Sequence, residues 1–400
     1  MRRGAWHQFG DKSQKLALQQ LKNGAGVGVV LSPRDLARKN AVKYSEKYRE
    51  LNADVIIDQQ FYIPHFLNNN LQSYPLSEFR AAVTTLHKIG DKDLSKLASS
   101  LEADSNELRA SAVIAPAVTY EAGRPDIVDI NAKLFDVARS VGNKLGIPVY
   151  ATVALGRSVT SAQSTTSAML SDVTGLEADG WYYAYEFESE RIPSSKQDVY
   201  RCSSAGLMLA CTGKPVMHAY AGPMSLLSLA FGAQAAAIGH SQNLWRFAPE
   251  RWEPPAGQGG GGDAPPRFFS RKLWGTIIQP DEIIRLSTAL RAEALTHTAF
   301  SDPIKANLAA PWSRWQANKH LVNIIVDTIA SIASNATARS AAESAIAILE
   351  GAVDLHSRIQ STGMILGDSA ASYQSAWLDS LKQLLSDNDS DLNYLEMLSS

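Results

Sequence analysis

The sequence lacks most of the residues and patterns that mark specialised sites. It has only two cysteines, Cys202 and Cys211, and neither belongs to a CxxC pair, which argues against a disulfide framework or a zinc knuckle and favours a reducing compartment. No apolar stretch reaches the about 18 residues that a membrane helix needs. The two N-terminal arginines are not followed by an apolar run, so the pattern of a secretory signal is missing. We therefore expect a cytoplasmic protein without membrane association.

An excess of charge of one sign is also missing. Lysine and arginine number 38, aspartate and glutamate number 40, and the net charge is -2. A nucleic-acid-binding domain usually carries a basic stripe, so the composition gives no sign of one, although a local patch remains open. GxSxG, HExxH and a GxGxxG after the first apolar run are absent as well. The sequence thus predicts no serine elbow, no metal site and no bound cofactor.

Short apolar runs that end in polar residues recur along the first 240 residues. They lack the alternation of a half-exposed strand, which indicates strands buried on both faces, as in parallel sheets. Amphipathic helical patterns separate them, for example at residues 33–51 and 125–146. The seven runs are Val27–Asp35, Val55–Gln60, Ser111–Glu121, Pro148–Arg157, Trp181–Glu188, Pro215–Gly222 and Ala235–Ser241.

This alternation predicts right-handed βαβ units around a parallel sheet. With a possible eighth strand at Leu273–Gln279, the count favours a TIM-type (β/α)8 barrel over an open doubly wound sheet. Only helical patterns follow Pro280. We therefore expect a barrel over residues 1–280 and a helical C-terminal region over residues 281–400. The Gly/Pro-rich stretch at residues 253–266 predicts a mobile loop, which is either a lid or an idle insertion.

The end of the second apolar run raises the question of a site. Asp58, Gln59 and Gln60 directly follow the buried residues Val55–Ile57. A buried charge costs several kcal/mol unless it is paired, and in a barrel the strand ends meet at the rim that carries the active site. We therefore predict that Asp58 helps to orient or transform a ligand.

The other strand ends supply partners for Asp58. Paired carboxylates suit general acid–base or nucleophilic chemistry. Asp58 with Glu186 is the first pair that we consider, with Glu121 or Glu188 as substitutes. His218 is either a catalytic residue or a satisfied core histidine. Arginines can hold anionic groups bidentately. The expected substrate-binding residues are Arg34, Gln59, Gln60, Arg157, Tyr185, His240, Asn243 and Arg246.

The segment from His218 to Gln242 predicts a second feature. Gly222 and Gly239 end neighbouring strands, and Ser225 can cap a short helix. Backbone amides freed by glycine, together with a helix N-terminus, attract phosphate or carboxylate groups. The alternative is that the glycines only permit tight turns.

Two stretches carry a family resemblance. "DGWYYAYEF" and "HAYAGPMSLLSLAFGAQAAAIGHSQN" resemble the base-reading strand and the glycine-containing turn, helix and strand of tRNA-guanine transglycosylase-like barrels. The similarity covers about half of the chain. The zinc-binding Cys/His set of that family is missing, and "AAIGHS" has no aspartate where the family's nucleophile would lie. The resemblance implies a base- or glycoside-handling barrel without the zinc module.

These observations lead to three hypotheses. The first is a barrel enzyme that acts on a nucleotide- or nucleobase-like ligand by carboxylate-assisted glycosidic or base-exchange chemistry, of transglycosylase or N-glycosidase type. The second is a flavin- or phosphosugar-binding barrel enzyme. The third is a non-catalytic scaffold or partner-binding subunit, whose C-terminal helices dock a protein partner or a second copy of the chain.

Overall fold

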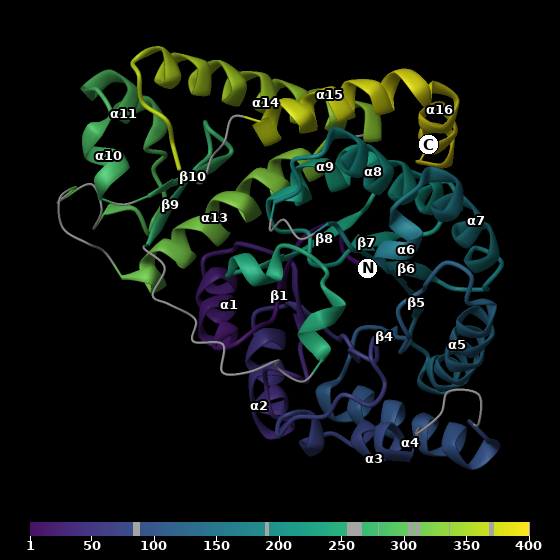
Figure 1. Cartoon of the computed structure of the whole chain (residues 1–400). Coiled ribbons are helices and arrows are strands. Elements are labelled where there is room, and N and C mark those ends of the chain that lie inside the picture. Colours follow the sequence, from purple (N-terminus) through teal and green to yellow (C-terminus); the bar gives the residue numbers. More distant parts are fainter. Residues whose placement is uncertain are drawn as a thin grey trace.

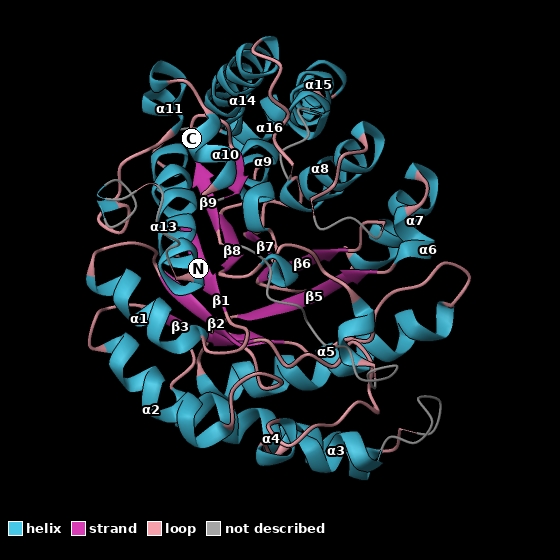
Figure 2. Ribbon diagram, turned by 60° about the vertical axis from the view of Figure 1, so that its left-hand side comes forward, coloured by secondary structure: helices cyan, strands magenta, loops and turns pink. Residues whose placement is uncertain are grey.

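The computed structural model shows a barrel of eight parallel strands surrounded by helices (Figure 2). It describes residues 1–82, 89–188, 192–253, 266–278, 280–302, 306, 308, 313–335, 337–367 and 372–399. The strands are β1 (Gly4–Gln8), β2 (Gly28–Leu31), β3 (Asp54–Ile57), β4 (Val113–Ile114), β5 (Val149–Leu155), β6 (Gly180–Tyr185), β7 (Val216–His218) and β8 (Ala235–Gly239).

The strand order closes the sheet into a barrel. It runs β3-β2-β1-β8-β7-β6-β5-β4, so β3 and β4 are the two end strands. The backbone amide of Ser111, just before β4, donates to the carbonyl of Val55 in β3 over 2.8 Å. Because this bond joins the two ends, the barrel is nearly closed, and the (β/α)8 architecture predicted from the sequence is confirmed.

One strand of the prediction is wrong. The predicted eighth strand, Leu273–Gln279, contributes β10 (Gly275–Ile278), which pairs antiparallel with β9 (Arg267–Ser270) outside the barrel. The missing barrel strand is β1, which pairs with both β2 and β8. β1 does not appear as an apolar run because it contains the polar residues His7 and Gln8. These side chains can be buried because they have hydrogen-bond partners elsewhere in the fold: His7 Nε2 lies 2.9 Å from the Ala25 carbonyl, and Gln8 accepts from the Tyr182 hydroxyl.

Helices follow the strands in the order that a barrel requires. Between β1 and β8 the helices are α1 (Ser13–Lys22), α2 (Arg38–Arg49), α3 (Leu76–Ala82), α4 (Asp91–Leu108), α5 (Pro125–Leu145), α6 (Arg157–Thr160), α7 (Gln163–Val173), α8 (Lys196–Ala210) and α9 (Ser225–Ser228). Several begin where the sequence predicts: Pro125 opens α5, and Gly146, with φ +67°, ends it, as expected of proline and glycine at these positions.

The C-terminal helices complete and cover the barrel. They are α10 (Asp281–Arg285), α11 (Thr288–Ala294), α13 (Arg314–Ala333), α14 (Ala338–Ser361), α15 (Ser372–Asp387) and α16 (Asp389–Ser399). The long helix α13 packs against β1, β8 and α1, in the place of the eighth barrel helix, while α14 and α15 lie across α8 and α9 (Figure 1). The predicted helical C-terminal extension is therefore confirmed; the division at residue 280 stays a prediction.

The barrel interior is filled with large side chains. Trp6, Tyr150 and Tyr182 are buried there with smaller residues such as Val30 and Ala237. Gly28 makes room for one of them, since a Cβ at this position would meet the Trp6 ring at 2.6 Å. The interior is thus a packed core rather than a channel, and a ligand has room only at an end of the barrel.

Candidate functional site at the barrel mouth

Asp58 lies just past β3 and is bound by a ring of tyrosines. Its carboxylate accepts hydrogen bonds from the hydroxyls of Tyr220 (2.6 Å), Tyr62 (3.0 Å) and Tyr182 (3.1 Å). The backbone amide of Gln60 also donates to it over 2.9 Å. Burial raises the pKa of Asp58, and these hydrogen bonds act in the opposite direction. We call these five residues the Asp58 cluster.

The backbone around the Asp58 cluster is strained. Gln60 (φ 51°) and Tyr220 (φ 54°) both have left-handed conformations that non-glycine residues rarely adopt. The buried guanidinium of Arg80 stabilises the backbone at Gln59 and Gln60 by donating to their carbonyls, over 2.7 and 2.5 Å. Burial lowers the pKa of Arg80 to about 9, while the charge of Asp58 raises it. Such strain persists only where surrounding contacts determine it, and it concentrates at functional sites.

Aromatic side chains close the space above Asp58. Phe247 and Trp252 lie on the chain that follows β8, and both pack edge-on against the Tyr62 ring, with ring centroids 4.8 and 4.7 Å away. Asp58 itself is 2% exposed. The predicted ligand-orienting residue is therefore at the barrel mouth, as expected, but it is enclosed by aromatic side chains that are themselves buried.

A cavity of about 240 Å³ opens beside these aromatic side chains. It lies between the segments that follow β1, β2 and β8, which are adjacent strands of the barrel. We call it the mouth pocket; its lining residues are Gly10, Asp11, Arg34, Asp35, Ser241, Asn243, Leu244, Arg246, Ala248 and Arg251. Carboxyl ends of barrel strands are where barrel proteins bind ligands, so the mouth pocket is the candidate site.

Charged side chains dominate the mouth pocket. Asp35 is held in place by the Ser32 hydroxyl (2.7 Å) and by the Arg34 guanidinium (3.0 Å). Arg251 approaches the same carboxylate only to 3.9 Å. Instead, its guanidinium lies over the rings of Trp252 and Tyr220, at 5.3 and 5.8 Å from their centroids. Arg246 pairs with Glu250 at 2.8 Å.

The Asp58 cluster and the mouth pocket share a hydrogen-bond network. The side-chain carbonyl of Gln60 accepts from the Arg34 backbone amide over 3.0 Å, and its amide donates to the Tyr220 hydroxyl over 3.4 Å. Gln60 therefore connects an arginine of the pocket with a tyrosine of the cluster. Tyr220 in turn supports Arg251 through its ring. The buried cluster consequently fixes the wall of the pocket.

The structure brings three of the predicted substrate-binding residues together. Arg34, Asn243 and Arg246 all line the mouth pocket. His240 lies beside it, with Nδ1 2.7 Å from the Ser13 hydroxyl, and burial lowers its pKa. Gln59 and Gln60 are buried beneath the mouth. These placements follow from the barrel, since the ends of β2 and β8 are separated only by β1.

Other predicted site residues lie around the ends of β5 and β6 or on exposed loops. Glu186 accepts from the Arg157 backbone amide over 2.7 Å, and burial raises the pKa of Glu186. The Arg157 guanidinium pairs with Asp198 and Glu188. The Tyr185 hydroxyl donates to the Thr160 carbonyl. Glu121 is exposed. The predicted pair of Asp58 and Glu186 therefore shares no hydrogen bond: each carboxylate has its own protein donors.

His218 faces the helix layer rather than the mouth. Its Nδ1 lies 2.7 Å from the Ser228 hydroxyl, and its ring packs against Tyr183 and Phe231. Burial lowers the pKa of His218 to about 3. Of the two roles that the sequence left open, the satisfied core histidine matches this placement.

The glycines predicted to bind phosphate are covered by protein. A Cβ on Gly222 would meet the Trp245 ring at 2.5 Å, and one on Gly239 would meet the Leu244 side chain at 2.0 Å. Ser225 is fully buried. These residues are not among those that line the mouth pocket. Their conformational freedom and small size serve the close packing of the segment that follows β8.

Three charged residues of the pocket are new relative to the predicted site. Asp11 follows β1, the strand that hydropathy did not reveal. Asp35 appears in the sequence beside Arg38, which suggests a local pair, but Arg38 binds Asp104 and Glu107 instead. Arg251 lies in "FAPERWEPP", where nothing marks it as part of a site. Residues 254–265, which hold most of the predicted lid, lie outside the described part of the chain.

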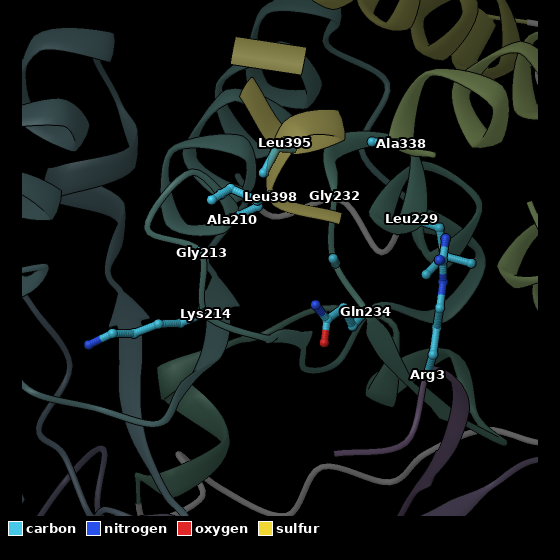
Figure 3. A pocket seen from close by; sticks show the side chains of 11 residues that line it. Arg3, Ala210, Gly213, Lys214, Leu229, Gly232, Gln234, Ala338, Leu395 and Leu398 are labelled. Atoms are coloured by element: carbon cyan, nitrogen blue, oxygen red, sulfur yellow. The ribbon is translucent and has the colours of Figure 1, made fainter. Parts of the chain in front are cut away.

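A smaller cavity, of about 110 Å³, lies at the opposite end of the barrel (Figure 3). Arg3, Lys214 and Gln234, which precede strands, line it together with Leu395 and Leu398 of α16. The Lys214 ammonium group is directed to other partners, the Leu176 carbonyl and the Trp181 ring. This cavity has two charged lining residues, whereas the mouth pocket has five.

The described residues include no cluster of three or more histidine, cysteine, aspartate or glutamate side chains arranged to hold a metal ion. They also include no helix that is both long and apolar enough to cross a membrane.

Comparisons with known proteins identify no family for this chain. No family model and no curated protein matches the chain. It is similar to a glycerol uptake operon antiterminator-related protein from Thermotoga maritima (13% identity, 61% of this chain and 99% of that one, TM-score 0.32). It is also similar to a candidate aldo-keto reductase from Pseudomonas aeruginosa (12%, 62% and 86%, 0.34) and to D-psicose 3-epimerase (8%, 62% and 90%, 0.34). None of the three is a tRNA-guanine transglycosylase.

Proposed function

We propose that this chain is a small-molecule enzyme of the (β/α)8 class and that its reaction takes place in the mouth pocket. The observation that carries the proposal is the placement of Asp35, which lines the pocket, is 10% exposed at its side chain and is fixed by Ser32 and Arg34. A carboxylate that is held in one geometry beside a cavity suits a nucleophile or a general base.

A second carboxylate faces the same cavity in a different environment. Asp11 lines the pocket from the segment after β1, and its side chain is 79% exposed. Different environments allow two carboxylates to take different roles in one reaction. Asp35 is suited to contact the reacting atom, and Asp11 to exchange protons with solvent. The carboxylate-pair hypothesis drawn from the sequence thus applies better to Asp35 and Asp11 than to Asp58 and Glu186.

The size of the pocket bears on the substrate. A cavity of about 240 Å³ is at the small end of ligand pockets, which suits a sugar, a base or part of a nucleotide. We keep glycosidic or base-exchange chemistry on a nucleotide-like ligand as the reaction type, since paired carboxylates perform it.

The proposal is tested by incubating the protein with ribonucleosides and nucleoside 5′-monophosphates and measuring the released base by chromatography. Asp35→Asn removes the charge but keeps the shape, and we expect it to lower the rate by roughly 100-fold or more. Glu107→Gln is the matched control, because Glu107 also pairs with an arginine but lies outside the pocket. Absence of base release from every compound, or an unchanged rate in Asp35→Asn, would contradict the proposal.

A scaffold function is the second candidate. The observation in its favour is that Phe247, Trp252 and Tyr62 fill the centre of the mouth, where many barrel enzymes bind substrate. Under this alternative Asp35→Asn changes no reaction, and the C-terminal helices serve a protein partner. Co-purification of the same partner with the wild-type protein and with Asp35→Asn, without turnover by either, would favour it.

A further inference from the structure

We infer that the mouth pocket binds the phosphate group of its ligand, a phosphate monoester or diphosphate, through Arg34, Arg246 and Arg251. This inference rests on the proposed site but names the class of ligand, which the proposed function leaves open. It differs from the phosphate site predicted at Gly222, Ser225 and Gly239.

The charges around the pocket are the first part of the argument. Three guanidinium groups line it, and their close counter-ions are Asp35, 3.0 Å from Arg34, and Glu250, 2.8 Å from Arg246. The charge of Asp11 is largely in solvent, where it is screened. Among the described residues, no carboxylate lies closer than 3.9 Å to one guanidinium, that of Arg251, and an anionic ligand would balance it.

Arg251 is held as a binding group would be. Its side chain is 15% exposed, and the nearest carboxylate oxygen, on Asp35, is 3.9 Å away. Its guanidinium lies against two aromatic rings, at 5.8 and 5.3 Å from their centroids. Keeping a cation nearly buried costs free energy unless an anion accompanies it. Nη1 of Arg251 and Nε of Arg34 are also buried without an acceptor in the described part of the chain, so the protein does not use their full donor capacity.

The arrangement favours phosphate over a single carboxylate. One arginine suffices to hold a carboxylate bidentately, whereas here guanidinium groups from two different segments, after β2 and after β8, surround one cavity. Phosphate offers three or more acceptor oxygens and a second negative charge, and arginine matches its geometry. The net charge of -2 for the whole chain argues for a small ligand rather than a long polyanion.

The experiment is a titration of the full-length protein with sodium pyrophosphate, inorganic phosphate and sodium acetate at low ionic strength, followed by calorimetry and by tryptophan fluorescence, because Trp252 stacks on Arg251. We expect pyrophosphate to bind more tightly than phosphate, and acetate to bind least. Arg251→Gln and Arg246→Gln should each weaken pyrophosphate binding by roughly tenfold or more. Arg124→Gln is the control, since Arg124 follows β4 at the same end of the barrel and pairs with Asp126 outside the pocket.

The possible outcomes separate the two proposals. Equal binding of acetate and pyrophosphate, absence of pyrophosphate binding, or an equal loss in Arg124→Gln would overturn the inference. If Arg251→Gln unfolds, Arg246→Gln, whose arginine is only partly buried at the pocket wall, gives the answer. Selective pyrophosphate binding without base release from any nucleotide supports the phosphate site and contradicts the proposed reaction. Base release from nucleosides and nucleotides at equal efficiency supports the reaction and contradicts the phosphate site.

Discussion

The Asp58 cluster and the mouth pocket are neighbours at one end of the barrel, and they differ in how many hydrogen-bond partners the protein supplies to a charged side chain. Asp58 receives four donors from Tyr62, Tyr182, Tyr220 and the Gln60 backbone. Arg251 is almost as deeply placed, but its nearest carboxylate oxygen is 3.9 Å away. A buried group whose hydrogen bonds are all supplied by the protein is part of the folded structure, whereas a charged group with spare donors is available to a ligand. The two regions therefore differ in how fully the protein satisfies the hydrogen-bonding capacity of their charged groups, and not in how deeply those groups are buried.

The largest expected effect is on the Asp58 cluster. Asp58→Ala would leave the hydroxyls of Tyr62 and Tyr220 and one backbone amide without their acceptor, while Tyr182 would keep only Gln8. It would also release the strained turn at Gln60. We expect the free energy of unfolding to fall by about 3 kcal/mol or more, as measured by urea denaturation. Asp35→Ala is the comparison, and its loss should be about 1 kcal/mol or less. Equal losses in the two variants would remove the distinction between the regions.

An intermediate effect is expected on the pH dependence of stability. Burial raises the pKa of Asp58 above its ordinary value of 3.8, so the folded protein binds this proton more tightly than the unfolded chain does. The stabilisation is then fully present below the unfolded pKa and is lost as pH rises through the folded pKa. Asp58→Asn cannot lose a proton and should lack this decline.

The measurement is the difference in unfolding free energy between the wild-type protein and Asp58→Asn, determined at intervals from pH 4 upward. Groups common to both proteins, including Asp104 with its pKa raised to about 6, cancel in the difference. The wild type should lose stability relative to Asp58→Asn as pH rises. A difference that is constant, or that grows in favour of the wild type, would show that the hydrogen bonds outweigh desolvation at Asp58.

Most of the fold could be predicted from the sequence, because its elements carry local signals. Seven barrel strands were identifiable because a strand buried on both faces is a continuous apolar run. β1 was not, because the partners of His7 and Gln8 are Ala25 and Tyr182, which no local pattern connects to it. Helices such as α5 carry both their apolar stripe and their end signals in the sequence, and they appear as expected.

The candidate site was predictable only in part. The rule that strand ends converge correctly placed Arg34, Asn243 and Arg246 together. It could not tell that Asp58 would be enclosed. The tyrosine donors of Asp58 come from the segment after β3, the interior of β6 and the segment after β7, and their directions depend on the folded backbone. Nor could it include Arg251, whose place depends on stacking with Tyr220 and Trp252. Convergence follows from topology, whereas the pairing of charges follows from side-chain geometry.

The smallest expected effect is on Arg251 itself, and it sharpens the comparison most. Removing this guanidinium has two opposing effects on stability. The loss of a desolvated charge without a close counter-ion among the described residues stabilises the fold, and the loss of two ring contacts, worth about 1 kcal/mol each, destabilises it. We expect Arg251→Gln to change the free energy of unfolding by no more than about 1 kcal/mol in either direction, while pyrophosphate binding falls. Arg80→Gln is the contrasting variant, since Arg80 donates to backbone carbonyls and should be needed for stability. A large loss of stability in Arg251→Gln would mean that this arginine stabilises the fold. The mouth pocket would then not differ from the Asp58 cluster in leaving a charged group free for a ligand.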